Sequence, residues 1–162
     1  NLSPLGEYAA MTQAMTPNAD NHEGLGPMAS RFVEVHQLPW EETRFTGVKA
    51  KTLLVDKNAG TVTVLLKMDP GAVLPDHEHV LIEQTFVIEG ALICDEGTCT
   101  AGNFVWRPAG SRHTARTPNG GLMLAMFQVP NKFFENDGSV TDMLNQDWDE
   151  TWGGAKSQVY KV

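Results

Sequence analysis

The chain has 162 residues, of which 41% are hydrophobic and 20% are charged, and its formal net charge is −8 at pH 7. This length and composition fit one globular domain with its own hydrophobic core. The acidic balance argues against nucleic acid or an anionic membrane surface as a partner, and no apolar run reaches the roughly 18–20 residues that span a bilayer.

The first 30 residues differ in character from the rest of the chain. They are rich in Ala, Met, Asn, Pro and Gly and show no steady hydrophobic period. We predict an N-terminal arm over residues 1–30, with at most one short helix at Tyr8–Met15, that is either mobile or packed on a neighbouring subunit. Residues 31–162 are then expected to form a single domain.

Short apolar segments separated by glycine and proline follow the arm. Many short strands with little helix predict an all-β sandwich or barrel. Near the C-terminus, Thr141 is a candidate N-cap for a helix that runs to about Trp152 and ends at Gly153 and Gly154. The predicted strands are Phe32–Val35, Val48–Val55, Thr61–Met68, His77–Ile82, Gln84–Glu89, Ala91–Cys94, Phe104–Arg107, His113–Arg116 and Leu122–Val129.

The two cysteines, Cys94 and Cys99, flank a predicted hairpin loop. Their spacing is neither that of a CxxC redox pair nor that of a zinc knuckle. A cross-strand disulfide fits the spacing, and two reduced thiols in a cytosolic protein are the alternative. The N-terminus lacks the basic start and apolar stretch of a secretory signal, which predicts a cytoplasmic protein.

Candidate metal ligands gather around His77-Glu78-His79. On an extended strand the side chains of His77, His79 and Glu83 would point to the same face. His113 follows the predicted turn Pro108–Gly110, and antiparallel pairing would bring it beside them. Imidazole and carboxylate together suit Fe, Mn, Ni, Cu, Co or Zn, and four such ligands leave positions open for catalysis.

The spacing of the first cluster resembles a known family motif. Gly71, five residues, His77–His79, three residues, Glu83, six residues and Gly90 match the first cupin motif at every fixed position. The resemblance implies a cupin fold, a double-stranded β-helix or jelly-roll barrel. Gly71 and Gly90 are expected at turns that require positive φ.

A second cupin motif is matched further along the chain. Gly102, five residues, Pro108–Gly110, two residues and His113 resemble its pattern. Thr117 stands where the motif normally has Asn, but that position is structural. The two motifs together imply one divalent metal ion, held by His77, His79, Glu83 and His113.

A narrower resemblance is to the ChrR-type cupins. It is carried by Pro75–His79, Glu83–Thr85, Glu89-Gly90 and Trp106–His113. That subgroup includes the cupin domain of a zinc-binding anti-sigma factor, and it is similar to iron enzymes such as acetylacetone and dihydroxyacetophenone dioxygenases. The resemblance implies Fe(II), with Zn, Ni or Mn as other ions, a small hydroxyketone or diketone substrate, O2 as co-substrate, and a homodimer.

Two other functions compete with a dioxygenase. One is a stand-alone metal-binding sensor of the anti-sigma-factor type. Residues 1–30 contain no cysteine and are shorter than the zinc domain that grips the sigma factor, so sigma binding itself is not expected. The other is a metal-dependent isomerase or lyase, which would need an acid–base pair beside the metal that the sequence does not identify.

Four further residues are candidates for a substrate pocket. Phe104 and Trp106 share one face of their strand and either line the pocket or belong to the core. Arg107 would attract an anionic substrate or form a surface ion pair. Gln128 is a candidate polar group at the end of the long apolar strand.

Overall fold

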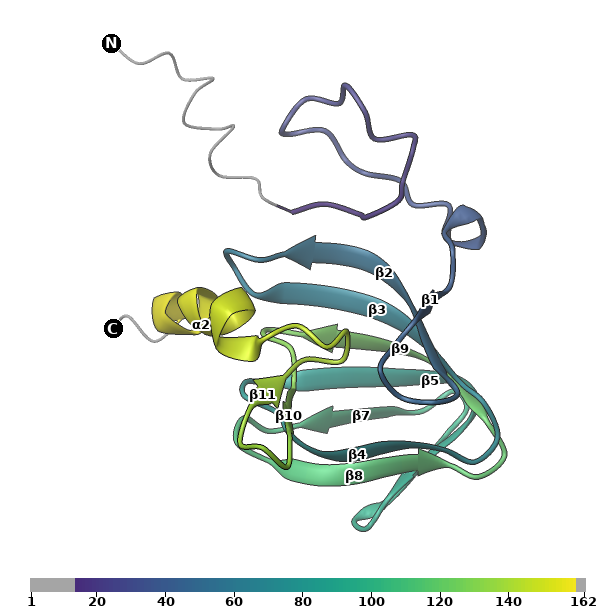
Figure 1. Ribbon diagram of the computed structural model, residues 1–162. Helices are drawn as coiled ribbons and strands as arrows, with labels where there is room; N and C mark the ends of the chain where they lie inside the picture. Colours follow the sequence, from purple (N-terminus) through teal and green to yellow (C-terminus); the bar gives the residue numbers. More distant parts are fainter. Residues whose placement is uncertain (1–13, 160–162) are drawn as a thin grey trace.

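β-Strands are the main secondary structure in the computed structural model, which describes residues 14–159 (Figure 1). None of the helices in this part of the chain has the length and apolar character needed to cross a membrane. The elements are η1 (Val35–Gln37), β1 (Glu41–Glu42), β2 (Val48–Asp56), β3 (Thr61–Met68), β4 (Ala72–Glu78), β5 (Glu83–Cys94), β6 (Gly97–Thr100), β7 (Phe104–Arg107), β8 (Arg112–Thr117), β9 (Gly121–Phe127), β10 (Lys132–Phe134), β11 (Val140–Thr141) and α2 (Trp148–Val159).

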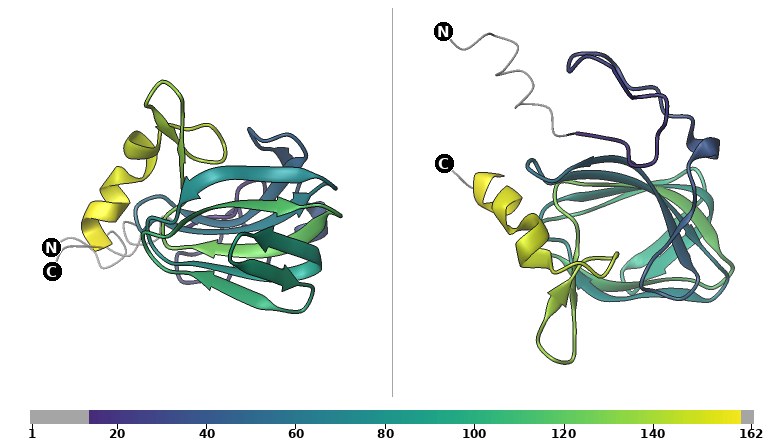
Figure 2. Two further views of the ribbon diagram at one scale, coloured as in Figure 1. Left: turned by 90° about the horizontal axis from the view of Figure 1, so that it is seen from below. Right: turned by 45° about the horizontal axis from the view of Figure 1, so that its top comes forward.

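Strand β5 joins the two halves of the sheet. Its first half pairs with β9 on one side and β7 on the other, and its second half pairs with β6 and β8. The main order of hydrogen-bonded strands is β1-β2-β3-β9-β5-β8-β4-β10-β11. The sheet curls round on itself, with α2 beside one end (Figures 1 and 2). The expected all-β barrel with a short C-terminal helix is therefore confirmed.

The interior of the barrel is filled by alternate residues of its strands. On β3, Val62, Val64, Leu66 and Met68 are buried, whereas the residues between them are exposed or half-buried. Such a period of two places one face of a strand inward and the other outward. This alternation, already visible in the sequence of β3, fixes which side chains of β3 can reach the interior.

Gly90 lets β5 continue where two separate strands were predicted. Its φ is +71°, as expected for a position that only glycine adopts readily, and Gly71 likewise has φ +85°. A Cβ at Gly90 would lie 2.1 Å from the carbonyl oxygen of Gly120. The pairing with β9 shifts between Val87 and Glu89, which marks a β-bulge. The glycine therefore bends the strand from one half of the sheet into the other instead of ending it.

The predicted C-terminal helix begins later than expected. Thr141 lies in β11, where it pairs with Phe133, so it is not available as an N-cap. The helix starts at Trp148, and Asp147 caps it by accepting a 2.9 Å hydrogen bond from the backbone N–H of Glu150. Gly153 and Gly154 lie inside α2 and do not end it.

The predicted strand Phe32–Val35 is also wrong, because this segment is irregular and leads into η1. Most of the helix expected at Tyr8–Met15 lies outside the described residues. Met15 itself pairs with Val55, with backbone hydrogen bonds of 2.9 Å in both directions. The described start of the arm therefore lies along β2 of its own chain, while the division of the chain at residue 30 stays a prediction.

Candidate metal centre

Three histidines meet inside the barrel. His77, near the end of β4, lies opposite His113 of β8 in the strand register, and His79 follows directly after β4. Their ring centroids are 4.7–5.0 Å apart, and one nitrogen from each ring lies within 4.8 Å of the other two. His77 and His79 are only 2% and 0% exposed. The interior thus gathers imidazoles at a spacing that one metal ion could bridge.

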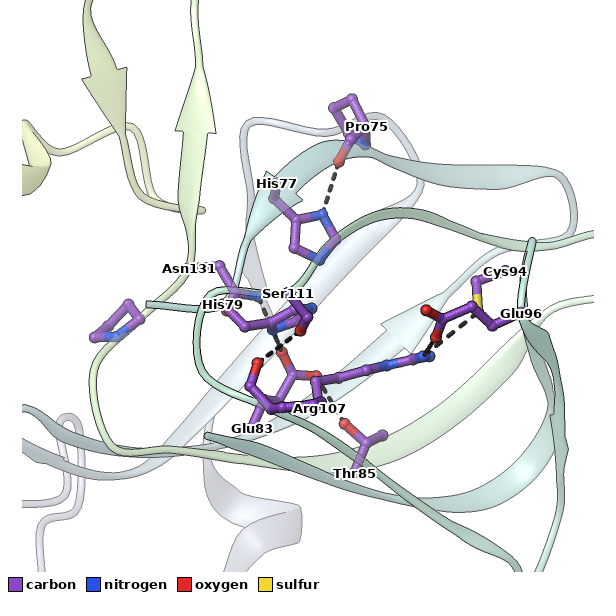
Figure 3. A network of polar contacts seen from close by, with 12 residues as sticks. Pro75, His77, His79, Glu83, Thr85, Cys94, Glu96, Arg107, Ser111 and Asn131 are labelled. Atoms are coloured by element: carbon purple, nitrogen blue, oxygen red, sulfur yellow. Dashed lines mark hydrogen bonds and ion pairs between the residues drawn. The ribbon is translucent and has the colours of Figure 1, made fainter. Parts of the chain in front are cut away.

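A β-bulge turns His77 inward. Leu74 and His77 are both buried although three positions separate them, and the register with β8 shifts between them. The bulge holds Pro75 and Asp76 outside, and it therefore resets the alternation by one residue. The carbonyl of Pro75 accepts a hydrogen bond from His77 Nδ1 at 2.7 Å (Figure 3). Since a carbonyl only accepts, Nδ1 carries the proton and Nε2 is left unprotonated.

The turn of the second motif holds His79. The backbone N–H of His79 donates to the carbonyl of Ser111, and the N–H of Gly110 donates to the carbonyl of His79, at 2.9 and 2.6 Å. This corrects the prediction of a continuous strand at His77–Ile82, because β4 ends at Glu78 and the chain bends before β5. His79 is inside because the Pro108–Ser111 turn fixes its backbone, not because strand residues alternate.

Glu83 begins β5 beside the histidines. Its Oε1 accepts a hydrogen bond from Thr85 Oγ1 at 2.8 Å, and its Oε2 accepts one from Asn131 Nδ2 at 3.0 Å (Figure 3). Oε2 also lies 2.7 Å from His79 Nδ1. Burial raises the pKa of Glu83, but His79 and the Asn131 amide lower it more, and the net pKa is about 2. The carboxylate is therefore buried, ionised and held at both oxygens.

Several nitrogens of the cluster have no hydrogen bond. Nε2 of His79 and Nδ1 of His113 lack a hydrogen-bond partner among residues 14–159, whereas Nδ1 of His79 lies 2.7 Å from Glu83 Oε2. Buried polar atoms are normally paired, so unpaired imidazoles around one point indicate a missing common partner. Imidazole and carboxylate donors fit a divalent transition metal, and the three histidines could bind one.

The protonation states of the cluster suit metal binding. Burial is the main cause that lowers the pKa of His77. Burial and the neighbouring His77 lower the pKa of His113 to about 3. Metals bind neutral imidazole and ionised carboxylate, so the electrostatics of the cavity favour the ligand forms at neutral pH.

Three of the predicted pocket residues point away from this cluster. Phe104 and Trp106 are 49% and 56% exposed, on the outer face of β7, and Gln128 is exposed after the end of β9. The alternation along β7 leaves Val105 and Arg107 on the inner side. The sequence showed that Phe104 and Trp106 share a face, but both alternatives for that face, the substrate pocket and the barrel core, are corrected by the exposure of these side chains.

Arg107 is buried yet does not reach the histidines. It lies opposite Glu83 in the register, but its guanidinium extends to the β5–β6 hairpin (Figure 3). There Nη1 lies 3.4 Å from Cys94 Sγ and 3.3 Å from Glu96 Oε2. Within the described chain Cys94 and Cys99 are both free thiols, and across the hairpin Cys99 lies opposite Leu92 and not opposite Cys94. The disulfide alternative is therefore wrong.

The structure adds residues that the sequence did not single out. A cavity of about 20 Å³, room for a water-sized group, lies beside His77, Glu83 and His113. Asn131 and Met143 also line it. Asn131 lies between Pro130 and the start of β10, and the one signal in the sequence was a polar residue soon after the apolar segment of β9. Met143 fell within the helix predicted from Thr141 to about Trp152, which gave no reason to place it at the site, and it lies instead in the segment between β11 and α2.

The family described as the ChrR cupin-like domain matches residues 28–132 of this chain. No curated protein matches the chain in sequence. Among solved structures, a candidate acetylacetone dioxygenase from Methylibium petroleiphilum is similar, with 22% identity and a TM-score of 0.64, covering 82% of this chain and 96% of that one.

Two further structures are similar. An acetylacetone dioxygenase from Acinetobacter johnsonii has 18% identity and a TM-score of 0.62, covering 80% of this chain and 93% of that one. The anti-sigma factor ChrR, in complex with SigE of Rhodobacter sphaeroides, has 23% identity and a TM-score of 0.50, covering 57% of this chain and 50% of that one. At these identities the likeness establishes the fold and not an activity.

Proposed function

This chain belongs to the ChrR cupin-like domain family, and on that premise we propose that it is a metal-dependent dioxygenase that cleaves a C–C bond of a small hydroxyketone or diketone. One observation carries the proposal: imidazole nitrogens of His79 and His113 that have no hydrogen-bond partner within residues 14–159 lie with His77 around one point, beside the buried carboxylate of Glu83. The proposed metal ligands are His77, His79, His113 and Glu83.

The residues around the cavity prepare it for an ion. Pro75 fixes the ring of His77 so that Nε2 carries the lone pair, and Asn131 and Thr85 hold the two oxygens of Glu83. Such outer contacts orient ligands and raise their affinity for metal. A bound divalent ion would act as a Lewis acid that favours an enolate and would bring substrate and O2 together.

Fe(II) is the ion we propose, with Zn, Ni or Mn as other occupants, because the donors alone do not select among these metals. The dioxygenase proposal draws on the names of two proteins with the same fold. It also fits a site of three imidazoles and one carboxylate, which leaves positions for further oxygen ligands on a five- or six-coordinate ion. A homodimer and a cytoplasmic location stay predictions from the sequence.

A metal-dependent sensor is the second candidate function. It is favoured by the small size of the histidine cavity, about 20 Å³, which holds a water-sized group and no larger molecule in this conformation. It also fits the likeness to ChrR. A sensor would bind its signal without turnover, and an enzyme would consume oxygen repeatedly.

Oxygen uptake by the iron-loaded protein tests these proposals. The full chain is loaded with ferrous iron anaerobically, its iron content is measured, and dissolved oxygen is followed as hydroxyacetophenones and β-diketones are added. His113→Ala is the variant, and His36→Ala, an exposed histidine with 75% side-chain exposure, is the matched control. Stoichiometric uptake by wild type and His36→Ala alone supports the dioxygenase. A loaded protein without uptake on any compound would favour the sensor.

A further inference from the structure

Two cavities share one wall in this barrel. The small cavity beside the histidines and a larger one of about 220 Å³ are both lined by Phe127, Asn131 and Met143. The larger one, here called the apolar chamber, lies between β2, β3 and the segment that leads into α2. These three residues therefore form a boundary common to the two cavities.

The apolar chamber has the character of a small-molecule site. Ligand pockets are mostly apolar, with a few polar groups that set orientation. Exposed Lys57 and Leu144 belong to its lining, so it opens to solvent. The apolar part of the lining includes Val55, Val62, Val64, Phe127, Phe133 and Trp152.

Asn131 supplies the polar group at the boundary. It is 6% exposed, and its Nδ2 must face Glu83, because a carboxylate only accepts hydrogen bonds. Its Oδ1 is buried and has no partner within residues 14–159. A buried amide oxygen without a donor is rare. Asn131 Oδ1 could therefore accept a hydrogen bond from a molecule in the adjoining cavities.

Met143 is the movable part of the wall. Its backbone is fixed by Asp142, whose Oδ1 accepts from the N–H groups of Leu144 and Gln146 at 2.9 Å, and whose Oδ2 accepts from Trp152 Nε1 at 3.0 Å. The half-buried methionine side chain is unbranched and has several rotatable bonds. Such a side chain can change its rotamer while the backbone stays in place.

We propose that the apolar chamber binds the body of the substrate, and that Asn131 Oδ1 accepts a hydrogen bond from a hydroxyl of that molecule. The ligand class is a small uncharged molecule with an apolar body and one hydroxyl donor. Met143 separates this body from the metal end of the site. As an assignment of a substrate subsite, the inference rests on the proposed function.

Binding of two probes with one carbon skeleton tests the inference. 1-Phenylethanol offers a hydroxyl donor, whereas acetophenone offers only an acceptor. Each is titrated by calorimetry into the full chain loaded with zinc, whose content is measured for every variant. The wild type is expected to prefer 1-phenylethanol by about fivefold, the size of one net hydrogen bond.

Two variants and a matched control locate the probes. Asn131→Ala should abolish the preference between the probes, and this ratio within one protein is insensitive to a general loss of stability. Thr52→Trp fills the chamber that Thr52 lines and should abolish the binding of both probes. Thr63→Trp makes the same change on the neighbouring strand β3, at a half-buried position between inward-facing Val62 and Val64, and should leave binding unchanged.

Each outcome separates the inference from the proposed function. Unchanged binding in Thr52→Trp, or a retained preference in Asn131→Ala, would overturn the inference even when zinc is bound. Binding that follows the expected pattern in a chain that takes up no zinc would support the chamber and contradict the metal site.

Discussion

The histidine cavity and the apolar chamber lie side by side but are built differently. His77 and His113 sit on paired strands, and backbone hydrogen bonds from the Pro108–Ser111 turn hold His79. The chamber is closed on one side by the turn at Asp142–Gln146, which is held mainly through one buried carboxylate. Ligands that must meet one ion require the rigid part of the sheet, whereas a surface that selects a substrate can be carried by a turn.

Removal of a histidine ligand should have the largest effect, which is a loss of metal affinity at the histidine cavity. His77→Ala or His113→Ala is expected to weaken zinc binding at least about a hundredfold, because the ion loses a ligand. The measurement is a competition titration with a chelator, with the exposed His36→Ala as control. Full metal retention in both variants would show that the ion is held elsewhere.

Asn131 joins the two regions, and its replacement should give an intermediate effect. Asn131→Ala removes the hydrogen bond to Glu83 Oε2, and metal affinity is expected to fall about tenfold, as for other residues that orient a ligand. Asn103→Ala is the control, since within residues 14–159 the exposed side-chain amide of Asn103 donates a hydrogen bond to Thr100 and does not contact the proposed ligands. Equal metal affinities for the two variants would show that Asn131 does not orient Glu83 for metal binding.

Trp152→Phe should affect the chamber alone. The variant removes the 3.0 Å hydrogen bond from Nε1 to buried Asp142 and leaves a carboxylate oxygen without this donor, at an expected cost of about 2 kcal/mol in the free energy of unfolding. Metal affinity should stay at the wild-type value, because no proposed ligand contacts this indole. Denaturant unfolding and the chelator titration measure the two quantities. A parallel loss of metal affinity would show that the two regions are coupled.

Met143→Ala is expected to have the smallest effect on stability. The side chain is half-buried, so its truncation should lower the free energy of unfolding by about 1 kcal/mol or less. We expect the truncation to join the two cavities. Zinc affinity should not change, and 1-phenylethanol should still bind. A crystal structure of the variant with a closed wall between the cavities would contradict the role given to Met143.

The sequence was informative where a residue's own chemistry or spacing was the evidence. Strands β2, β3 and β7 were predicted from apolar segments bounded by turn residues, and the spacing of Gly71, Gly90 and the histidines indicated the family. The prediction failed for β5, because a local pattern does not show that Gly90 bends a strand instead of ending it. It failed for the helix start, because the Asp137-Gly138 pair marks a turn but does not show that Thr141 pairs with Phe133 beyond it.

By itself, the sequence determined the class of fold and the set of candidate ligands, because strand period, turn residues and donor chemistry are local properties. Only the tertiary structure decided which way these residues face. The bulge at Pro75 and Asp76 turns His77 inward, and the pairing of β7 with β5 leaves Trp106 outside. Asn131 and Met143 became site residues for the same reason, since contacts between distant segments arise when the barrel closes.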